Sequence, residues 1–126
     1  MRTLFPLTVL ALLLACGAPS SGVTDIMPEE LLSSPPSSTL ILDVRTAEEF
    51  ASGHVPGAIN ISHEAVESRI AELGDDKSRS VVVYCEKGGR AGKAATALLE
   101  AGFTNVRHLA GDMGAWRSAG RPTAKP

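Results

Sequence analysis

The sequence predicts an α/β domain in which helices cover both faces of a small parallel β-sheet. Two uninterrupted apolar runs, Leu40–Leu42 and Val81–Tyr84, lack the polar alternation of a half-exposed strand. Strands that are buried on both faces of a parallel sheet have this composition. Helical patterns follow both runs. Alternating strands and helices imply right-handed crossover connections, which place a parallel sheet between two helix layers. The chain of 126 residues is long enough for one domain.

The first elements of this domain are expected between residues 23 and 39. Val23–Ile26 is predicted to be a short edge strand. Pro28–Leu32 favours a short helix, because proline suits the first helical position and two acidic residues follow it in the first turn. Ser33–Thr39 contains two prolines and four serines, which predicts a surface loop.

The next elements follow the first apolar run, whose carboxyl end is marked by Asp43. Thr46–Glu49 is a capping-box pattern and predicts a helix that continues to about Ser52. Gly53–Gly57 is typical of a turn, and Ala58–Ile61 is then expected to form a short strand.

A further helix is predicted over Glu64–Leu73. Its apolar residues fall on one stripe, and Gly74 ends the pattern. Residues 75–79 are polar and are expected to form the loop before the second apolar run.

The helix after this second run has its apolar residues at three- and four-residue spacing: Ala91, Ala94, Ala95, Leu98 and Leu99. Gly102 suits a left-handed helix end, which would bring Phe103 against the helix. Val106–Leu109 is the last predicted strand. In a parallel sheet, the segments after all these strands meet at one edge, where ligands bind.

Cys85 lies where the second apolar strand becomes a helix. The first turn of a helix has unpaired N–H groups and a partial positive charge. Gly88 and Gly89 allow the loop to curl so that several N–H groups point inward and form a cradle for an anion. A thiol in this position is expected to be present partly as thiolate. The alternative is a buried cysteine that acts only as a small apolar side chain.

The charged residues of this loop have opposing effects on the thiol. Lys87 and Arg90 add positive charge, and Glu86 adds negative charge. The negative charge of Glu86 is expected to oppose a dianionic substrate at the sulfur. Four residues separate Cys85 from Arg90, whereas cysteine-based phosphatases have five residues at this place, in a loop wide enough for phosphate.

Three stretches of this chain resemble the rhodanese family of sulfurtransferases. The segment from Cys85 to Ala91 matches the pattern C-x-x-G-x-R-[SA], which is common among single-domain rhodaneses. Leu40–Ile61 resembles the N-terminal signature of the family. Ala110–Pro122 resembles its C-terminal signature, in which a Gly-rich turn leads to a helix that carries a tryptophan, here Trp116. The resemblance covers residues 23–123, so residues 124–126 are expected to be a short tail.

The resemblance implies a rhodanese-like fold and sulfur transfer without a cofactor or metal. Cys85 would be the catalytic residue and would carry a terminal sulfur as a persulfide. The implied substrate-binding residues are Glu86, Lys87, Gly88, Gly89, Arg90 and Ala91. The implied sulfur donor is thiosulfate-like, and the implied acceptor is cyanide or a thiol. Asp43 and Arg45 would be a supporting buried pair, although both could instead shape the mouth of the site.

Two other functions stay open. The first is a phosphatase or arsenate reductase of the same fold, which the short loop disfavours. The second is a module that binds sulfane sulfur, or docks a partner, without turnover.

The N-terminus predicts export and lipidation. Residues 1–15 combine a positive start with a short apolar run, as in a secretory signal peptide. Leu13–Gly17 resembles the lipobox of bacterial lipoproteins, in which the signal is cut before a cysteine, here Cys16, whose sulfur receives a diacylglycerol. Residues 16–22 would then be a tether, and the domain would lie at an extracytoplasmic membrane face, in the periplasm or at the cell surface. An ordinary signal peptide is the alternative.

Composition narrows the possible partners. The net charge is −2 and no basic face stands out, so nucleic acid is not an expected partner. With Cys16 lipidated, Cys85 would be the only free thiol of the chain, and a disulfide between the two is the competing interpretation. Three histidines without ligand spacing predict no metal site. A monomer is expected.

The remaining polar and aromatic residues have structural interpretations. His54 lies in a Gly-His-Val-Pro-Gly turn and is predicted to be a hydrogen-bonded turn histidine. The sequence indicates no partner for His63 or His108. Trp116 is expected to anchor the core or a lid.

Overall fold

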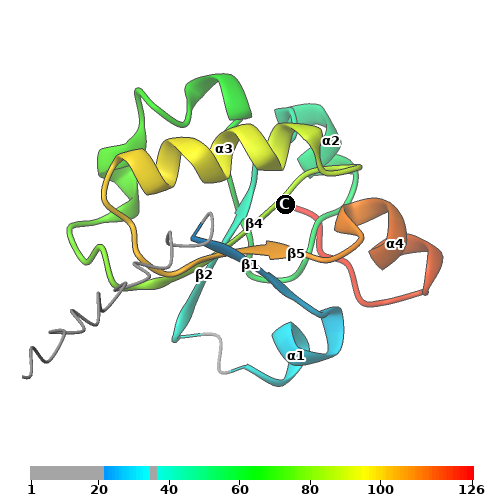
Figure 1. Ribbon diagram of the computed structural model, residues 1–126. Coiled ribbons are helices and arrows are strands. Elements are labelled where there is room, and N and C mark those ends of the chain that lie inside the picture. Colours follow the sequence, from blue (N-terminus) through cyan, green and yellow to red (C-terminus); the bar gives the residue numbers. More distant parts are fainter. Residues whose placement is uncertain (1–21, 35–36) are drawn as a thin grey trace, which may run out of the picture.

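The computed structural model describes residues 22–34 and 37–126 (Figure 1). Its centre is a five-stranded sheet in the order β1-β5-β4-β2-β3, in which every pairing is parallel. The strands are β1 (Val23–Ile26), β2 (Thr39–Asp43), β3 (Ile59–Asn60), β4 (Ser80–Tyr84) and β5 (Val106–Leu109). The predicted signal peptide and Cys16 lie outside the described residues.

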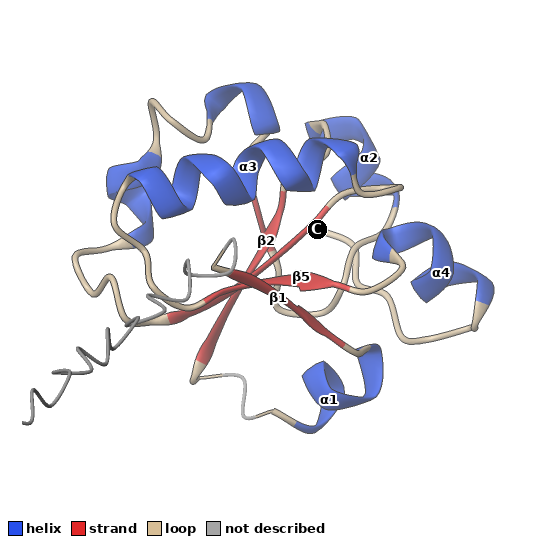
Figure 2. Ribbon diagram, in the orientation of Figure 1, coloured by secondary structure: helices blue, strands red, loops and turns tan. Residues whose placement is uncertain are grey.

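Helices cover both faces of the sheet, as predicted (Figure 2). They are α1 (Pro28–Ser33), α2 (Ala47–Ser52), α3 (Gly89–Glu100) and α4 (Asp112–Ser118). Helix α3 crosses one face and α1 lies on the opposite face. Within the described part of the chain, no helix has the length and apolar character needed to cross a bilayer.

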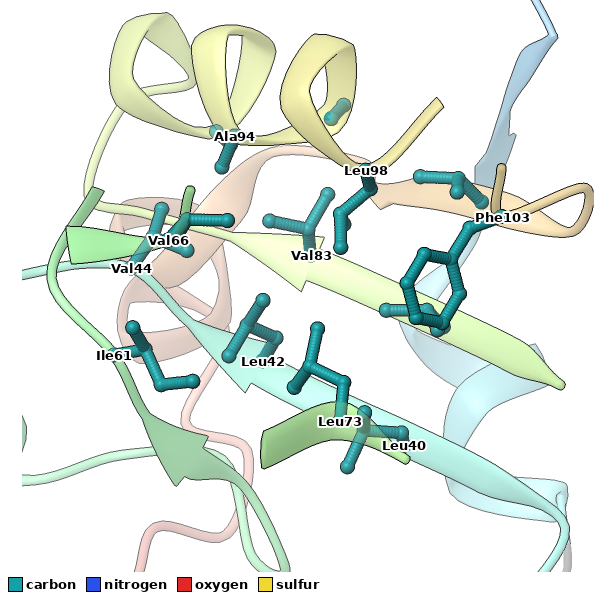
Figure 3. Packing of buried hydrophobic residues seen from close by; sticks show 14 of the residues in the cluster. Leu40, Leu42, Val44, Ile61, Val66, Leu73, Val83, Ala94, Leu98 and Phe103 are labelled. Atoms are coloured by element: carbon teal, nitrogen blue, oxygen red, sulfur yellow. The ribbon is translucent and has the colours of Figure 1, made fainter. Parts of the chain in front are cut away.

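Strand β4 is buried on both faces, because its side chains enter two different cores. Val81 and Val83 pack in the core beneath α3, whereas Val82 and Tyr84 pack in the core that includes α1 and α4. All four are fully buried. Figure 3 shows the first core, where residues of the sheet meet α3; among them are Leu42, Val44, Val83, Ala94 and Leu98.

Local signals placed the ends of two helices correctly. Thr46 and Glu49 form the predicted capping box at the start of α2. Helix α3 ends at a left-handed Gly102, whose N–H donates to the Leu99 carbonyl, while the Phe103 N–H donates to the Leu98 carbonyl. These two bonds are the Schellman motif, and Phe103 and Leu98 share one core.

The predicted helix Glu64–Leu73 is wrong. This stretch forms two short 3₁₀ segments, η1 (His63–Ala65) and η2 (Ile70–Leu73), separated by turns. Arg69, just before η2, has φ −111° and ψ 13°, which interrupts helical geometry. A ten-residue helix has little stability of its own, so burial of Val66 and Leu73 in the core decides the backbone conformation. The predicted strand Ala58–Ile61 is shorter than expected, with only Ile59–Asn60 paired as a strand.

Candidate active site

Cys85 follows the central strand β4 and is 1% exposed. The backbone N–H of Gly88 donates to its Sγ at 2.9 Å. Gly88 has φ +116°, and a Cβ at this position would lie 3.1 Å from Asp112 Oδ2. A side chain at residue 88 would therefore be strained and crowded, and glycine lets the loop turn its N–H toward the sulfur.

A cavity of about 290 Å³ opens over this loop and is lined by Cys85, Glu86, Lys87, Gly89 and Arg90. The structure thus brings together most of the residues that the sequence predicted to bind substrate. Gly88 contributes its N–H to the sulfur. Ala91 does not line the cavity, because its side chain is fully buried in the core beneath α3.

Arg90 does not present a free positive charge to this cavity. Its Nη1 and Nη2 donate to the two carboxylate oxygens of Glu49, from α2, at 2.6 and 3.0 Å. The hydrogen bonds from Arg90 lower the pKa of Glu49 to about 2. Short-range sequence patterns do not predict this pair, because the two residues are 41 positions apart.

Glu86 is likewise paired. Arg117 of α4 donates to both of its carboxylate oxygens, at 2.7 and 3.3 Å, and these bonds lower the pKa of Glu86. Arg45 Nη1 lies 3.8 Å from the same carboxylate. The negative charge that was expected to oppose substrate is therefore partly compensated. Among the described residues, Lys87 has no ion-pair partner, so it is the uncompensated cation of the cavity.

Asp43 and Arg45 form a buried ion pair at the carboxyl end of β2. Arg45 is 1% exposed and Asp43 is completely buried, and Arg45 Nη2 donates to Asp43 Oδ2 at 2.8 Å. The Tyr84 hydroxyl donates to the same oxygen at 2.7 Å, and Arg45 also donates to the Gly53 carbonyl at 2.8 Å. Burial, followed by the nearby Asp43 carboxylate, raises the pKa of Tyr84 well above its ordinary value. The pair therefore ties β2 to β4 and to the turn after α2.

Asp112 lies at the sheet edge where the sequence places the end of the last strand, but the sequence indicated no role for it and no partner for His108. The Cys85 N–H donates to Asp112 Oδ1 at 3.0 Å, and Cys85 Sγ lies 3.7 Å from that oxygen. His108 Nε2 lies 2.9 and 3.0 Å from the two Asp112 oxygens. The available signal was an acidic residue in the Gly-rich turn after the last strand, four positions beyond a histidine.

The start of α4 also holds the cysteine loop by backbone contacts. The Met113 N–H donates to the Cys85 carbonyl at 2.9 Å, and the Gly114 N–H donates to the Glu86 carbonyl at 3.1 Å. A Cβ on Gly114 would lie 3.2 Å from that second carbonyl, so the close approach favours glycine. Trp116 is fully buried in the core of α1 and α4, and its Nε1–H donates to the Pro122 carbonyl at 2.7 Å. Trp116 is therefore a core anchor.

The remaining histidines do not join the site's hydrogen bonds. His54 Nδ1 lies 2.9 Å from the Phe50 carbonyl, and the two rings stack with centroids 3.6 Å apart, which confirms the predicted turn histidine. His63 has no side-chain contact of this kind among the described residues. The part of the chain that the structure describes has no group of three His, Cys, Asp or Glu side chains able to hold a metal ion.

Comparisons with known proteins agree with this architecture. Residues 27–119 match the family model "Rhodanese-like domain". The chain is 40% identical over 94 residues to "Thiosulfate sulfurtransferase 16, chloroplastic" of Arabidopsis thaliana, covering 65% of this chain and 77% of that protein.

Two solved structures extend the comparison. "Rhodanese with anions from E. coli" is 38% identical and has a TM-score of 0.60, covering 70% of this chain and 99% of the other. A Rhodopseudomonas palustris protein described as a "Possible Tyrosine Phosphatase" is 28% identical, with a TM-score of 0.73, and covers 82% of this chain and 86% of the other. The matched family model spans most of the domain, including the cysteine loop, and this chain belongs to the rhodanese-like domain family.

Proposed function

We propose that this chain is a sulfurtransferase that carries sulfane sulfur as a persulfide on Cys85. The observation that carries the proposal is the hydrogen bond from the Gly88 N–H to Cys85 Sγ at 2.9 Å, at the base of a cavity. An N–H aimed at a sulfur stabilises that sulfur in its anionic form. The sulfurtransferase name of the Arabidopsis relative supports the same assignment.

The proposed reaction has two steps. The Cys85 thiolate attacks the outer sulfur of a thiosulfate-like donor, so a new S–S bond forms to the cysteine. The S–S bond within the donor breaks, and its electron pair leaves with sulfite. Cyanide or a thiol then attacks the terminal sulfur of the persulfide, which breaks the cysteine's new bond and restores the thiolate. This is covalent catalysis with ping-pong order.

Groups of this chain are placed to stabilise negative charge on sulfur in both the thiolate and the persulfide. The Gly88 N–H is directed at Sγ, and the twelve-residue helix α3 begins at Gly89 with its positive end toward the loop. Lys87 adds a cation at the cavity. A thiolate formed before the donor binds needs no separate general base.

Mass spectrometry tests this function directly. The full chain carrying Cys16→Ser has Cys85 as its single thiol. Incubation with thiosulfate should increase its mass by one sulfur atom, and cyanide should remove that atom as thiocyanate. Cys85→Ser, a small change in a buried site, should abolish both steps while the circular dichroism spectrum stays the same. A folded protein that gains no sulfur from thiosulfate or from a persulfide donor would leave the binding module as the better interpretation.

A phosphatase is the second candidate, because the Rhodopseudomonas structure carries that description. The four-residue spacing between Cys85 and Arg90 opposes it, and so does the ion pair that occupies Arg90. Phosphate binding in such a loop requires an arginine that is free to contact the phosphate oxygens.

The proposal extends to location and assembly. The lipobox-like segment supports lipidation of Cys16 and attachment to an extracytoplasmic membrane face. Two or three acyl chains would anchor the protein stably, because each buried CH₂ contributes about 0.8 kcal/mol. The domain is proposed to act as a monomer on small sulfur donors and acceptors.

A further inference from the structure

A line of polar contacts runs from the buried thiol to the surface. Cys85 Sγ lies 3.7 Å from Asp112 Oδ1, and Asp112 lies 2.9 Å from His108 Nε2. The other ring nitrogen, His108 Nδ1, lies 3.5 Å from Asp25 Oδ1. The Asp25 side chain is 73% exposed, whereas that of Asp112 is 3% exposed. Asp25 of β1 pairs with His108 of β5, and Asp112 is the first residue of α4. The line of contacts therefore crosses α4, β5 and β1.

Asp112 has a backbone conformation that most residues avoid. It is the only non-glycine residue with positive φ in the described part of the chain, at +54°. The position directs a carboxylate at the Cys85 N–H, which donates to Oδ1 at 3.0 Å. Asp112 therefore holds the residue that carries the reactive sulfur.

This arrangement raises an electrostatic problem for the proposed chemistry. A carboxylate within about 4 Å of a sulfur disfavours the anionic form of that sulfur. Solvent screens Asp112 only weakly, because its side chain is buried. Both the thiolate and the persulfide carry negative charge at this point, so the Asp112 charge needs compensation.

His108 is placed to supply that compensation. A protonated imidazole donates from both nitrogens, and each nitrogen of His108 faces a carboxylate. We propose that His108 is a positioning residue for the sulfur chemistry: as imidazolium it orients Asp112 against the Cys85 N–H and cancels the Asp112 charge. This inference rests on the proposed function, because sulfur transfer is what requires an anionic Cys85.

Apart from Lys87, which has no ion-pair partner among the described residues, the other charged groups near the thiol are paired with one another. Arg90 interacts electrostatically with Cys85 but is bound to Glu49. The remaining charged side chains that face this region from the loop, α4 and the end of β2 are Glu86, Lys87, Arg117, Arg45 and Asp43. Among the contacts of Asp112, His108 is the cation that can compensate it, so the effect should be specific to this pair.

The test measures how the anionic fraction of Cys85 depends on pH. The full chain with Cys16→Ser is alkylated with iodoacetamide across a pH series, and the midpoint of the rate profile is determined. His108→Gln keeps an N–H donor near Asp112 but cannot be protonated, so the midpoint should move up by roughly half a pH unit or more. Asp112→Asn keeps an oxygen for the Cys85 N–H and removes the charge, so the midpoint should move down.

The two changes should also be coupled. In the Asp112→Asn background, His108→Gln should shift the midpoint by less than half of its effect in the wild-type background. His63→Gln is the matched control, and it should leave the midpoint unchanged. Alkylation needs no sulfur donor, so failure of the mass-gain experiment with this coupling intact would reject the proposed function and keep the charge pair.

A midpoint in folded His108→Gln protein equal to that of the wild type overturns the proposal, and so does an equal shift in both backgrounds. If His108→Gln does not fold, His108→Asn takes its place, because its side chain also offers an N–H donor and cannot be protonated. A folded His108→Asn protein whose midpoint does not rise overturns the proposal, and one whose midpoint rises supports it.

Discussion

The guanidinium of Arg90 binds the carboxylate of Glu49 through two hydrogen bonds, at 2.6 and 3.0 Å. Arg90 comes from the first turn of α3, at the candidate active site, and Glu49 comes from α2. The pair neutralises the one arginine that lines the cavity around Cys85 and leaves Lys87 as the unpaired cation there. Charge at this cavity is therefore set by a residue outside the cysteine loop.

Glu49→Gln should release the Arg90 charge toward an anionic donor. The KM for thiosulfate should fall by about two- to fivefold at low ionic strength, the size expected for one partly exposed ion pair. The effect should shrink as salt is added, because salt screens exposed charges. Steady-state kinetics at two salt concentrations check this.

Glu48→Gln is the matched control for that prediction. Glu48 is exposed and lies beside Glu49 in α2. The substitution removes the same formal charge without releasing Arg90. An equal fall in KM for both variants would show that net charge, and not the ion pair, sets the affinity.

Inserting one glycine between Gly88 and Gly89 should disrupt sulfur transfer. The insertion moves the Gly88 N–H away from Cys85 Sγ, which it contacts at 2.9 Å. Loss of one directed N–H donor costs roughly a hundredfold or more in rate. Thiocyanate production checks the expected loss.

Comparing the rate of thiocyanate production with the rate of aryl phosphate hydrolysis separates the two candidate functions. Wild-type protein should transfer sulfur faster than it hydrolyses aryl phosphates, because the loop between Cys85 and Arg90 has one residue fewer than that of cysteine-based phosphatases. The opposite order of rates would reject the loop-length argument.

Asp43→Ala should destabilise the fold strongly. It leaves the Arg45 guanidinium buried without its carboxylate and removes the acceptor of the Tyr84 hydroxyl. Breaking a buried ion pair in this way costs about 3–5 kcal/mol of unfolding free energy. Urea denaturation followed by circular dichroism measures it.

Asp75→Ala is the control for this stability measurement, because Asp75 is exposed in a loop. Its unfolding free energy should stay within about 0.5 kcal/mol of the wild type. A loss in Asp43→Ala no larger than that of the control would mean that the buried pair does not hold β2 in place.

Cys16→Ala should block lipidation and leave the precursor uncut before residue 16. The wild-type protein should enter the detergent phase of a phase-separation extract. The variant should lack the mass that the acyl chains add to the wild-type protein. Wild-type protein that remains wholly in the aqueous phase would contradict the lipoprotein interpretation.

Most of the framework could be predicted because its signals are local. The run from Val81 to Tyr84 indicated a strand buried on both faces, and each of its side chains does enter one of the two cores. The capping box of Thr46 and the left-handed end at Gly102 depend on residues three to five positions apart. Local periodicity was misleading over Glu64–Leu73, where core packing imposed 3₁₀ turns.

The sequence by itself determined the parallel α/β architecture and the position of Cys85 at the end of a central strand. Only the tertiary structure decided the charge around that thiol. Arg90 and Glu49 are 41 residues apart, Glu86 and Arg117 are 31 apart, and Cys85 and Asp112 are 27 apart. No short-range spacing encodes such pairs, because they form where parallel strands end at one edge of the sheet and the following loops and helices meet.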